Sequence, residues 1–200
     1  MKSLLATLVL ALGLGALADG AAAQTVSGQA IIDALKPAPR TRDIGAPDAQ
    51  MTQSQSNLVS NLRKTTRAIQ VEEREELATI VAQPAVRKID LEVYFPLNSS
   101  LITPQATPLL INLGFALRSK DLQGGVYLVS GHTDITGPAA YNIELSQARA
   151  ISVKRFLVEN FRIDPSTLIA VGYGAEHLKN PANPAGGENR RVAVAALPTR

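Results

Sequence analysis

The chain has 200 residues, 46% of them hydrophobic and 18% charged, which suits one folded domain with extensions. Its 20 Lys and Arg against 17 Asp and Glu give a formal charge of only +3 and form no long basic run, so we expect no nucleic-acid binding. Cysteine is absent, which excludes disulfides, thiolate metal sites and cysteine nucleophiles.

Residues 1–23 have the pattern of a secretory signal peptide. Lys2 provides a positive start, an apolar run follows from Leu4 to Leu17, and three alanines at 21–23 supply the small residues that a signal peptidase requires. We expect cleavage before Gln24 and export of the mature chain. An uncleaved membrane anchor is the alternative, although the run is short against the roughly 20 residues of a spanning helix.

Residues 24–86 are predicted to be a linker with a helical extension. Prolines interrupt the stretch up to residue 50, which holds one short apolar island at 30–35. Residues 52–82 follow a helical period only in part, because their apolar stripe is broken between Ile69 and Leu77. This pattern is compatible with a helix and equally with a partly ordered tether.

A domain is predicted over residues 87–200, where the periodicity becomes regular. The expected elements, in chain order, are a strand over 89–95, a helix over 107–118, a strand over 126–129, a helix over 139–159, and strands over 168–173 and 191–197. This order predicts an α/β fold of the βαβαβ(β) type. We expect a two-layer sandwich with a mixed sheet and both helices on one sheet face.

Polar side chains gather where the second of these strands ends. Asp134 and Thr136 lie in the loop after the strand, and Asn142 and Arg149 are seven residues apart on the helix that follows, so both face the same side. A carboxylate and a guanidinium therefore border one region. The pair could be a structural salt bridge, or it could bind a zwitterion, with the aspartate taking an ammonium and the arginine a carboxylate.

Catalytic and metal-binding readings of this stretch have weaker support. Ser130, His132 and Asp134 alternate along the chain, whereas a Ser-His-Asp triad is a spatial relay, and no G-x-S-x-G turn is present. The chain contains only two histidines and no cysteine, so His132 with Asp134 would be short of ligands. We expect no catalytic residues, no metal and no cofactor.

The stretch GHTDITGPAAYNIELSQARA resembles the signature of the OmpA-like C-terminal domain, the peptidoglycan-binding module of Gram-negative envelope proteins. The resemblance extends over roughly Ile89 to Ala196. Its further matching segments are the V-Y-F strand followed by Asn98-Ser99-Ser100, then Val171-Gly172-Tyr173-Gly174, and Asn189-Arg190-Arg191-Val192 near the end.

This resemblance implies a βαβαβ-type fold and non-covalent binding of the diaminopimelate in the peptidoglycan stem peptide. By position, Asp134 would pair with the free ammonium of diaminopimelate and Arg149 with its carboxylate. Thr136, Asn142 and Arg190 match supporting contacts.

Two features depart from the family pattern. Pro96 stands where the family usually has an acidic residue, so one ligand contact is lost or replaced by backbone groups near Asn98. The segment 186–188 before Asn189 is short and lacks the usual arginine. Both changes bear on how tightly a ligand is held.

The resulting hypothesis is a non-enzymatic periplasmic protein that binds peptidoglycan and is associated with the cell wall or outer membrane. An outer-membrane or periplasmic protein partner would bind residues 24–86. The alternative is an assembly scaffold that uses the same fold for protein contacts, with weak or no cell-wall binding. The only support for a hydrolase is that Ser130, His132 and Asp134 occur together in one short stretch.

Overall fold

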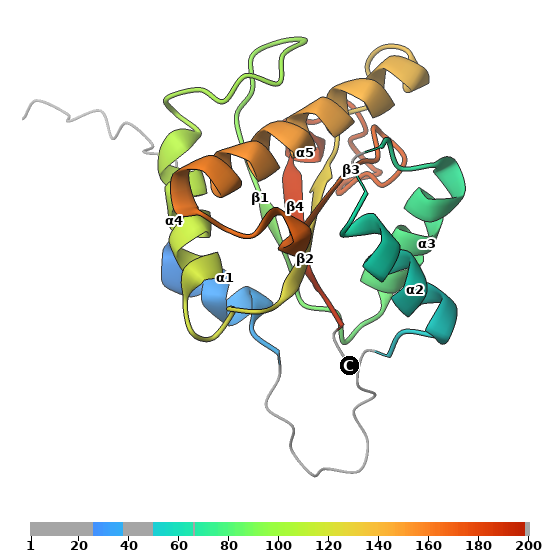
Figure 1. The fold of residues 1–200 in the computed structure, drawn as a ribbon. Coiled ribbons are helices and arrows are strands. Elements are labelled where there is room, and N and C mark those ends of the chain that lie inside the picture. The colour runs from blue at the N-terminus through green and yellow to red at the C-terminus, as the bar shows by residue number, and fades with distance from the viewer. Residues whose placement is uncertain (1–25, 38–49, 66, 199–200) are drawn as a thin grey trace, which may run out of the picture.

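The computed structural model describes residues 26–37, 50–65 and 67–198, so the predicted signal peptide lies outside the described residues. At its centre is one four-stranded mixed sheet of order β1-β4-β2-β3 (Figure 1). β2 and β3 are parallel, whereas β4 runs antiparallel to both β1 and β2. The strands are β1 (Lys88–Leu91), β2 (Val126–Gly131), β3 (Leu168–Gly172) and β4 (Val192–Leu197).

β1 is shorter than the strand predicted over 89–95, and the reason lies in its partner. Leu91 pairs with Val192, the first residue of β4, so the chain beyond Leu91 has no strand beside it in that register. Residues 92–100 leave the sheet as a loop instead. The other three strands agree with their predicted ranges to within two residues.

The two predicted domain helices, α4 (Thr107–Arg118) and α5 (Ala139–Phe161), cover one face of the sheet, as expected. A third helix, α1 (Gly28–Leu35), packs against α4 within the stretch that the sequence predicts as linker. It forms because Ile31 and Leu35, one turn apart, are both fully buried in the core under α4.

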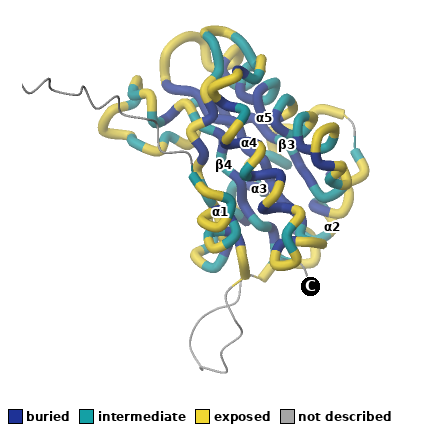
Figure 2. The backbone as a smooth tube through the Cα atoms, turned by 90° about the vertical axis from the view of Figure 1, so that its left-hand side faces the viewer, coloured by how far each residue is buried: buried dark blue, intermediate teal, exposed yellow. Residues whose placement is uncertain are grey.

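The opposite face of the sheet is covered by α2 (Gln53–Leu62) and α3 (Val71–Ala82). The broken apolar stripe of this region reflects two separate helices, the first ending at Leu62 and the second beginning at Val71. Leu77 and Ile80 are fully buried there in a cluster with Leu128 of β2. The sheet therefore lies between two helical layers (Figure 1), and every residue of β2 is buried. Figure 2 shows buried backbone in dark blue through the middle of the fold.

Polar contacts also join the layer of α2 and α3 to the segments before and after β3. The hydroxyl of Tyr173 donates to the Arg74 carbonyl at 3.2 Å, and Arg74 forms an ion pair with Glu176 at 3.3 Å. Arg63, just after α2, donates to the Ser166 carbonyl at 2.9 Å. The helices α2 and α3 are therefore attached to the domain by packing and by side-chain hydrogen bonds.

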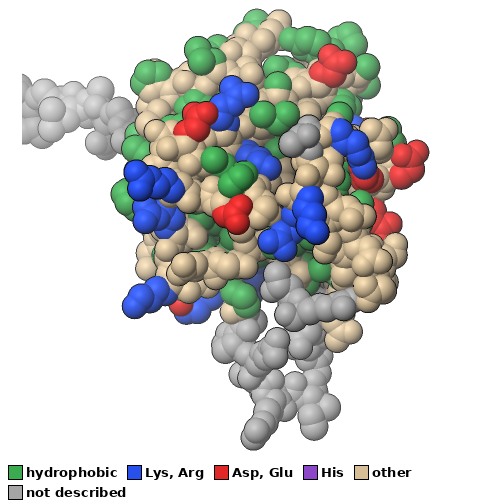
Figure 3. Space-filling view, in the orientation of Figure 1, with side chains coloured by type: hydrophobic (Ala, Val, Ile, Leu, Met, Phe, Trp, Pro, Cys, Tyr) green, Lys and Arg blue, Asp and Glu red, His purple; other side chains and the backbone are tan. Residues whose placement is uncertain are grey.

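The surface shown in Figure 3 carries Lys and Arg side chains that are scattered among acidic and uncharged ones. None of the described helices combines the length and hydropathy needed to cross a lipid bilayer.

Truncation of one α3 side chain tests whether this layer is part of the folded unit. We expect Leu77→Ala to lower the free energy of unfolding by about 2–5 kcal/mol, because it removes a fully buried side chain between α3 and the sheet. Val71→Ala, at a position on the same helix that is 52% exposed, should have little effect. Urea unfolding measures both, and equal stabilities for Leu77→Ala and the parent would show that α3 does not pack there.

Candidate functional site

The backbone of α5 lies directly against the carboxyl ends of β2 and β3. A Cβ atom on Gly131 would come within 2.1 Å of the Ser146 carbonyl oxygen, and one on Gly172 within 2.2 Å of the Gln147 backbone nitrogen. No real Cβ tolerates such distances, so these two positions require glycine. The contact fixes the first half of α5 beside the loops that leave β2 and β3.

Side chains of α5 reinforce this contact with hydrogen bonds to the β3 segment. The Gln147 amide accepts from the Gly172 N–H at 2.7 Å and donates to the Ala170 carbonyl at 3.1 Å. The Ser146 hydroxyl accepts from the Gly174 N–H at 2.8 Å. Gln147 thus satisfies backbone groups on the edge strand that would otherwise be open to another chain.

The loop that carries Asp134 is fastened on both sides. The Thr133 N–H donates to the Gly174 carbonyl at 2.8 Å, and the Ile135 N–H donates to the Pro184 carbonyl at 3.1 Å. Asn142 on α5 donates from its side-chain amide to the Thr136 carbonyl at 3.0 Å. Asn142 is 4% exposed, so it acts as a buried support for the loop.

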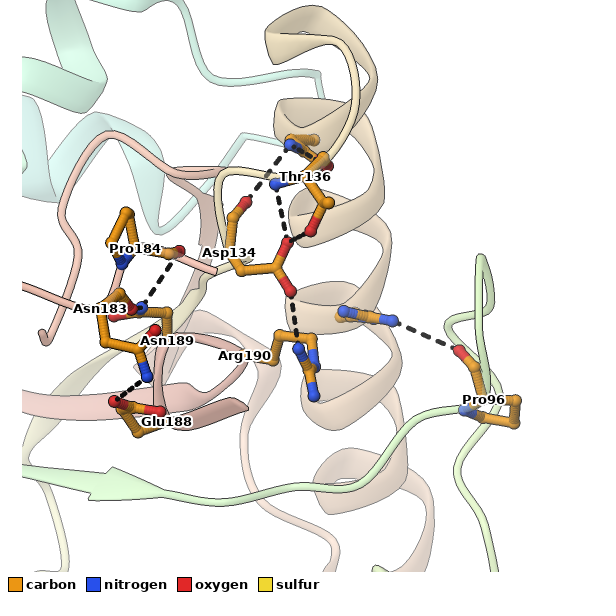
Figure 4. A network of polar contacts seen from close by, with 10 residues as sticks. Pro96, Asp134, Thr136, Asn183, Pro184, Glu188, Asn189 and Arg190 are labelled. Carbon is orange, nitrogen blue, oxygen red and sulfur yellow. Dashed lines mark hydrogen bonds and ion pairs between the residues drawn. The ribbon is translucent and has the colours of Figure 1, made fainter. Parts of the chain in front are cut away.

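The Asp134 carboxylate is buried and heavily hydrogen-bonded (Figure 4). One oxygen accepts from the Thr136 N–H at 2.9 Å and from the Thr136 hydroxyl, while the other accepts from Arg190 Nη1 at 2.7 Å. Burial opposes ionisation, but the hydrogen bonds from Thr136 and Arg190 outweigh it and hold the pKa of Asp134 below its ordinary value. Asp134 is therefore a stable anion in the folded protein.

Arg149 is 6% exposed and is held by the loop that follows β1. Its Nε donates to the Ser99 carbonyl at 3.0 Å and its Nη2 to the Pro96 carbonyl at 3.3 Å, and its guanidinium carbon lies 5.0 Å from the centre of the Phe95 ring. A guanidinium has five N–H groups, so about three remain after these two bonds. Pro96 thus contributes a carbonyl that positions the arginine, in place of a side-chain carboxylate.

Asn98 lies in the turn between these two carbonyls. It is exposed and has a φ of 52°, a left-handed conformation that asparagine tolerates better than most residues. The carbonyls on either side of Asn98 contact Arg149. That the ligand contact of the missing acidic side chain is lost or replaced by backbone groups near Asn98 stays a prediction.

The structure therefore groups the predicted residues around two centres. Asp134, Thr136, Asn142 and Arg190 are joined by direct hydrogen bonds, whereas Arg149 is bonded to the 96–99 turn. The two centres still influence each other electrostatically. Burial lowers the pKa of Arg149, the charge of Arg190 lowers it further, and the charges of Tyr141 and Asp134 oppose the shift.

Asn189 is a positioning residue that the sequence did not identify as part of the site. It is fully buried, and its side chain accepts from the Asn180 N–H at 2.9 Å and donates to the Asn183 carbonyl at 2.8 Å and to the Pro184 carbonyl at 3.2 Å (Figure 4). It closes the loop that presents Arg190. Its only sequence signal was its place in the N-R-R-V segment.

Within the short segment before Asn189, Glu188 accepts from the Asn180 side chain at 2.8 Å. This bond joins the beginning and the end of the 180–190 loop. The shortened loop is thus held by its own side chains.

The alternating Ser130, His132 and Asp134 do not form a relay. Ser130 donates to the Ala193 carbonyl at 3.2 Å, His132 stacks on Tyr173 with ring centres 5.5 Å apart, and Asp134 binds Thr136 and Arg190. Over the described ranges, no group of three or more His, Cys, Asp or Glu side chains is placed to hold a metal ion. The chemistry that this geometry supports is charge recognition.

The sequence profile of the OmpA family matches residues 94–191 of the chain. Outer membrane porin F of Pseudomonas fluorescens is 38% identical over 109 residues, a match that covers 54% of this chain and 32% of that protein. The Peptidoglycan-associated lipoprotein of Pseudomonas putida is 34% identical over 105 residues, which cover 50% of this chain and 60% of that protein. Outer membrane protein A of Bordetella avium is 32% identical over 111 residues, which cover 54% of this chain and 56% of that protein.

The chain thus spans less than two thirds of the length of each of these relatives. Among solved structures, the cell wall anchor of the T6SS from Pseudomonas aeruginosa aligns with a TM-score of 0.45 at 29% identity, covering 57% of this chain and 81% of that chain.

The buried His132 predicts a pH dependence of stability. Burial, with smaller contributions from Arg191 and His177, lowers the pKa of His132 from 6.5 to about 3. Between these values the unfolded chain binds a proton that the folded protein excludes. The stability contributed by neutral His132 is therefore complete above pH 6.5 and is lost as the pH falls toward 3.

We expect the free energy of unfolding to fall by up to about 1.4 kcal/mol per pH unit below the pKa of an unfolded histidine. In His132→Gln this slope should flatten between about pH 6 and pH 5, above the range where most carboxylates titrate. His177→Gln, which changes the exposed second histidine and removes only a small contribution to the lowered pKa of His132, should keep most of the slope. Urea unfolding across this range measures the slope, and the prediction fails if His132→Gln retains it.

Proposed function

Residues 94–191 place this chain in the OmpA family, and we propose on that premise that its domain binds peptidoglycan non-covalently. The ligand is the free amino-acid head of the diaminopimelate in the stem peptide. Asp134 takes the ammonium and Arg149 takes the carboxylate, with Thr136, Asn142 and Arg190 in support. No covalent chemistry is required of these residues, so the protein acts as a tether or organiser of the cell envelope rather than as an enzyme.

The observation that carries this proposal is that the opposite charges of Asp134 and Arg149 are both held in fixed positions by the fold. Asp134 is kept ionised by its hydrogen bonds, and Arg149 retains N–H groups beyond the two that contact carbonyls. An ammonium and a carboxylate on one carbon match such an arrangement, because charge-assisted hydrogen bonds are strongest where both partners are fixed. The names of two relatives, a peptidoglycan-associated lipoprotein and an outer membrane protein A, support the same placement in the envelope.

Arg149 also has a structural explanation, since it ties α5 to the 96–99 turn. A purely structural arginine would use its donors on the protein alone and would be replaceable without effect on a ligand. The proposal differs in requiring that Arg149 hold the turn and the ligand carboxylate at once. Variants at this position must therefore be compared for both folding and binding.

An assembly scaffold that uses the OmpA-like fold for protein contacts, with weak or no cell-wall binding, is the second candidate. It is favoured by the ordered layer of α2 and α3, which lies outside the region matched by the family profile. This layer adds a surface that cell-wall binding does not use. A partner in the outer membrane or periplasm would bind here.

Sedimentation with purified cell-wall sacculi tests the leading proposal. The protein should pellet with sacculi and be released by free meso-diaminopimelate. We expect Asp134→Asn and Arg149→Gln each to reduce retention at least tenfold, which corresponds to about 1.4 kcal/mol or more for one lost charge-assisted contact.

Two controls match these changes in charge. Glu159→Gln and Arg155→Gln alter exposed positions toward the other end of α5 and should pellet like the parent. Thermal unfolding establishes that each variant is folded. The proposal is wrong if folded Asp134→Asn and Arg149→Gln pellet normally, and salt-sensitive retention that is the same in all variants would indicate nonspecific attraction.

A further inference from the structure

Asp134 already has a cationic partner in the protein, and the partner comes from outside the β2 loop. Arg190 Nη1 lies 2.7 Å from Asp134 Oδ2, and the Arg190 side chain is 52% exposed while that of Asp134 is 10% exposed. The aspartate is thus fixed and sheltered, whereas the arginine reaches it from the surface. An incoming ammonium must share Oδ2 with Arg190 or displace it, since the other oxygen accepts two bonds from Thr136.

The charges around the site do not balance. One carboxylate, Asp134, faces two guanidiniums, Arg149 and Arg190, and the charge of Arg190 disfavours that of Arg149. A ligand that brought only an ammonium would add a third positive charge beside a single carboxylate. A ligand that brought an ammonium with an adjacent carboxylate would offer the guanidiniums an anion in exchange.

We infer that Arg190 determines ligand selectivity by occupying Asp134 in the unliganded domain, so that the site accepts an ammonium only when the same ligand supplies a carboxylate that Arg149 and the released Arg190 share. This inference rests on the proposed function and deepens it. The ligand class is an α-amino-acid head, and bare primary amines are excluded. An amino-acid head whose carboxylate is amidated is excluded for the same reason.

Positioning by the 180–190 loop makes this role specific to Arg190. The loop is closed by Asn189 and attached to the Asp134 loop through the bond from the Ile135 N–H to the Pro184 carbonyl. The neighbouring Arg191 is directed elsewhere, with its Nε on Asp90 at 3.0 Å and its Nη2 on the His177 carbonyl. Only one of the two consecutive arginines therefore meets Asp134.

A matched pair of ligands tests the inference. The first is diaminopimelate with one amino-acid head capped as an acetyl amide, and the second is lysine capped in the same way. Both present one ammonium on a similar aliphatic chain, and only the first has a carboxylate beside it. Dissociation constants for both are measured by calorimetry on the full chain, Arg190→Gln, Arg190→Lys and the charge-matched control Arg155→Gln.

For the parent and for Arg155→Gln, the dissociation constant of the diaminopimelate ligand should be roughly a hundredfold lower than that of the capped lysine. Arg190→Gln should bind the capped lysine at least tenfold more tightly than the parent does. It should also bind the diaminopimelate ligand more weakly, so both changes reduce the preference. Arg190→Lys should show part of the preference that Arg190→Gln loses. Lysine keeps the positive charge but lacks the paired N–H groups with which a guanidinium binds a carboxylate.

The inference is overturned if capped lysine binds Arg190→Gln no better than it binds the parent. An equal loss of both ligands would also overturn it, since this would make Arg190 a support for the loop. Failure of the parent to bind the diaminopimelate ligand would instead refute the proposed function itself. The two failures are therefore distinguishable in one set of titrations.

Discussion

Direct contact between the α5 backbone and the glycines at the ends of β2 and β3 determines where the charged groups of this domain lie. With Gly131 and Gly172 in place, the helix approaches the strands closely enough for Ser146 and Gln147 to bond the β3 segment. The same approach sets Asn142 under the Asp134 loop and brings Arg149 beneath the turn after β1. Because the backbone of α5 packs directly against Gly131 and Gly172, the side chains that support the site project from a fixed helix.

Much of the fold could be predicted from the sequence, because the sheet and its two main helices have regular apolar periods. α4 has the predicted bounds, and α5 extends the predicted helix by two residues. The end of β1 could not be predicted, because it depends on where β4 begins, at Val192. Nor could the docking of α1, α2 and α3, since short apolar stripes do not reveal which surface buries them.

For the candidate site, the sequence predicted which residues would take part but not which groups of the protein they would contact. Spacing on a helix correctly placed Asn142 and Arg149 on one buried side of α5. It could not show that Arg149 bonds the carbonyls of the 96–99 turn, or that Arg190 pairs with Asp134, because both contacts join segments more than 45 residues apart in sequence. Carbonyl contacts of this kind leave no trace in residue type, which is why Asn189 also remained unidentified.

The most direct test of this account is a crystal structure of the protein with the capped diaminopimelate bound. The account predicts that the ligand ammonium lies within hydrogen-bonding distance of the Asp134 carboxylate and that the ligand carboxylate lies on Arg149, with the α5 contact at Gly131 unchanged. A ligand head bound on the α2–α3 layer, or bound with its ammonium away from Asp134, would contradict it.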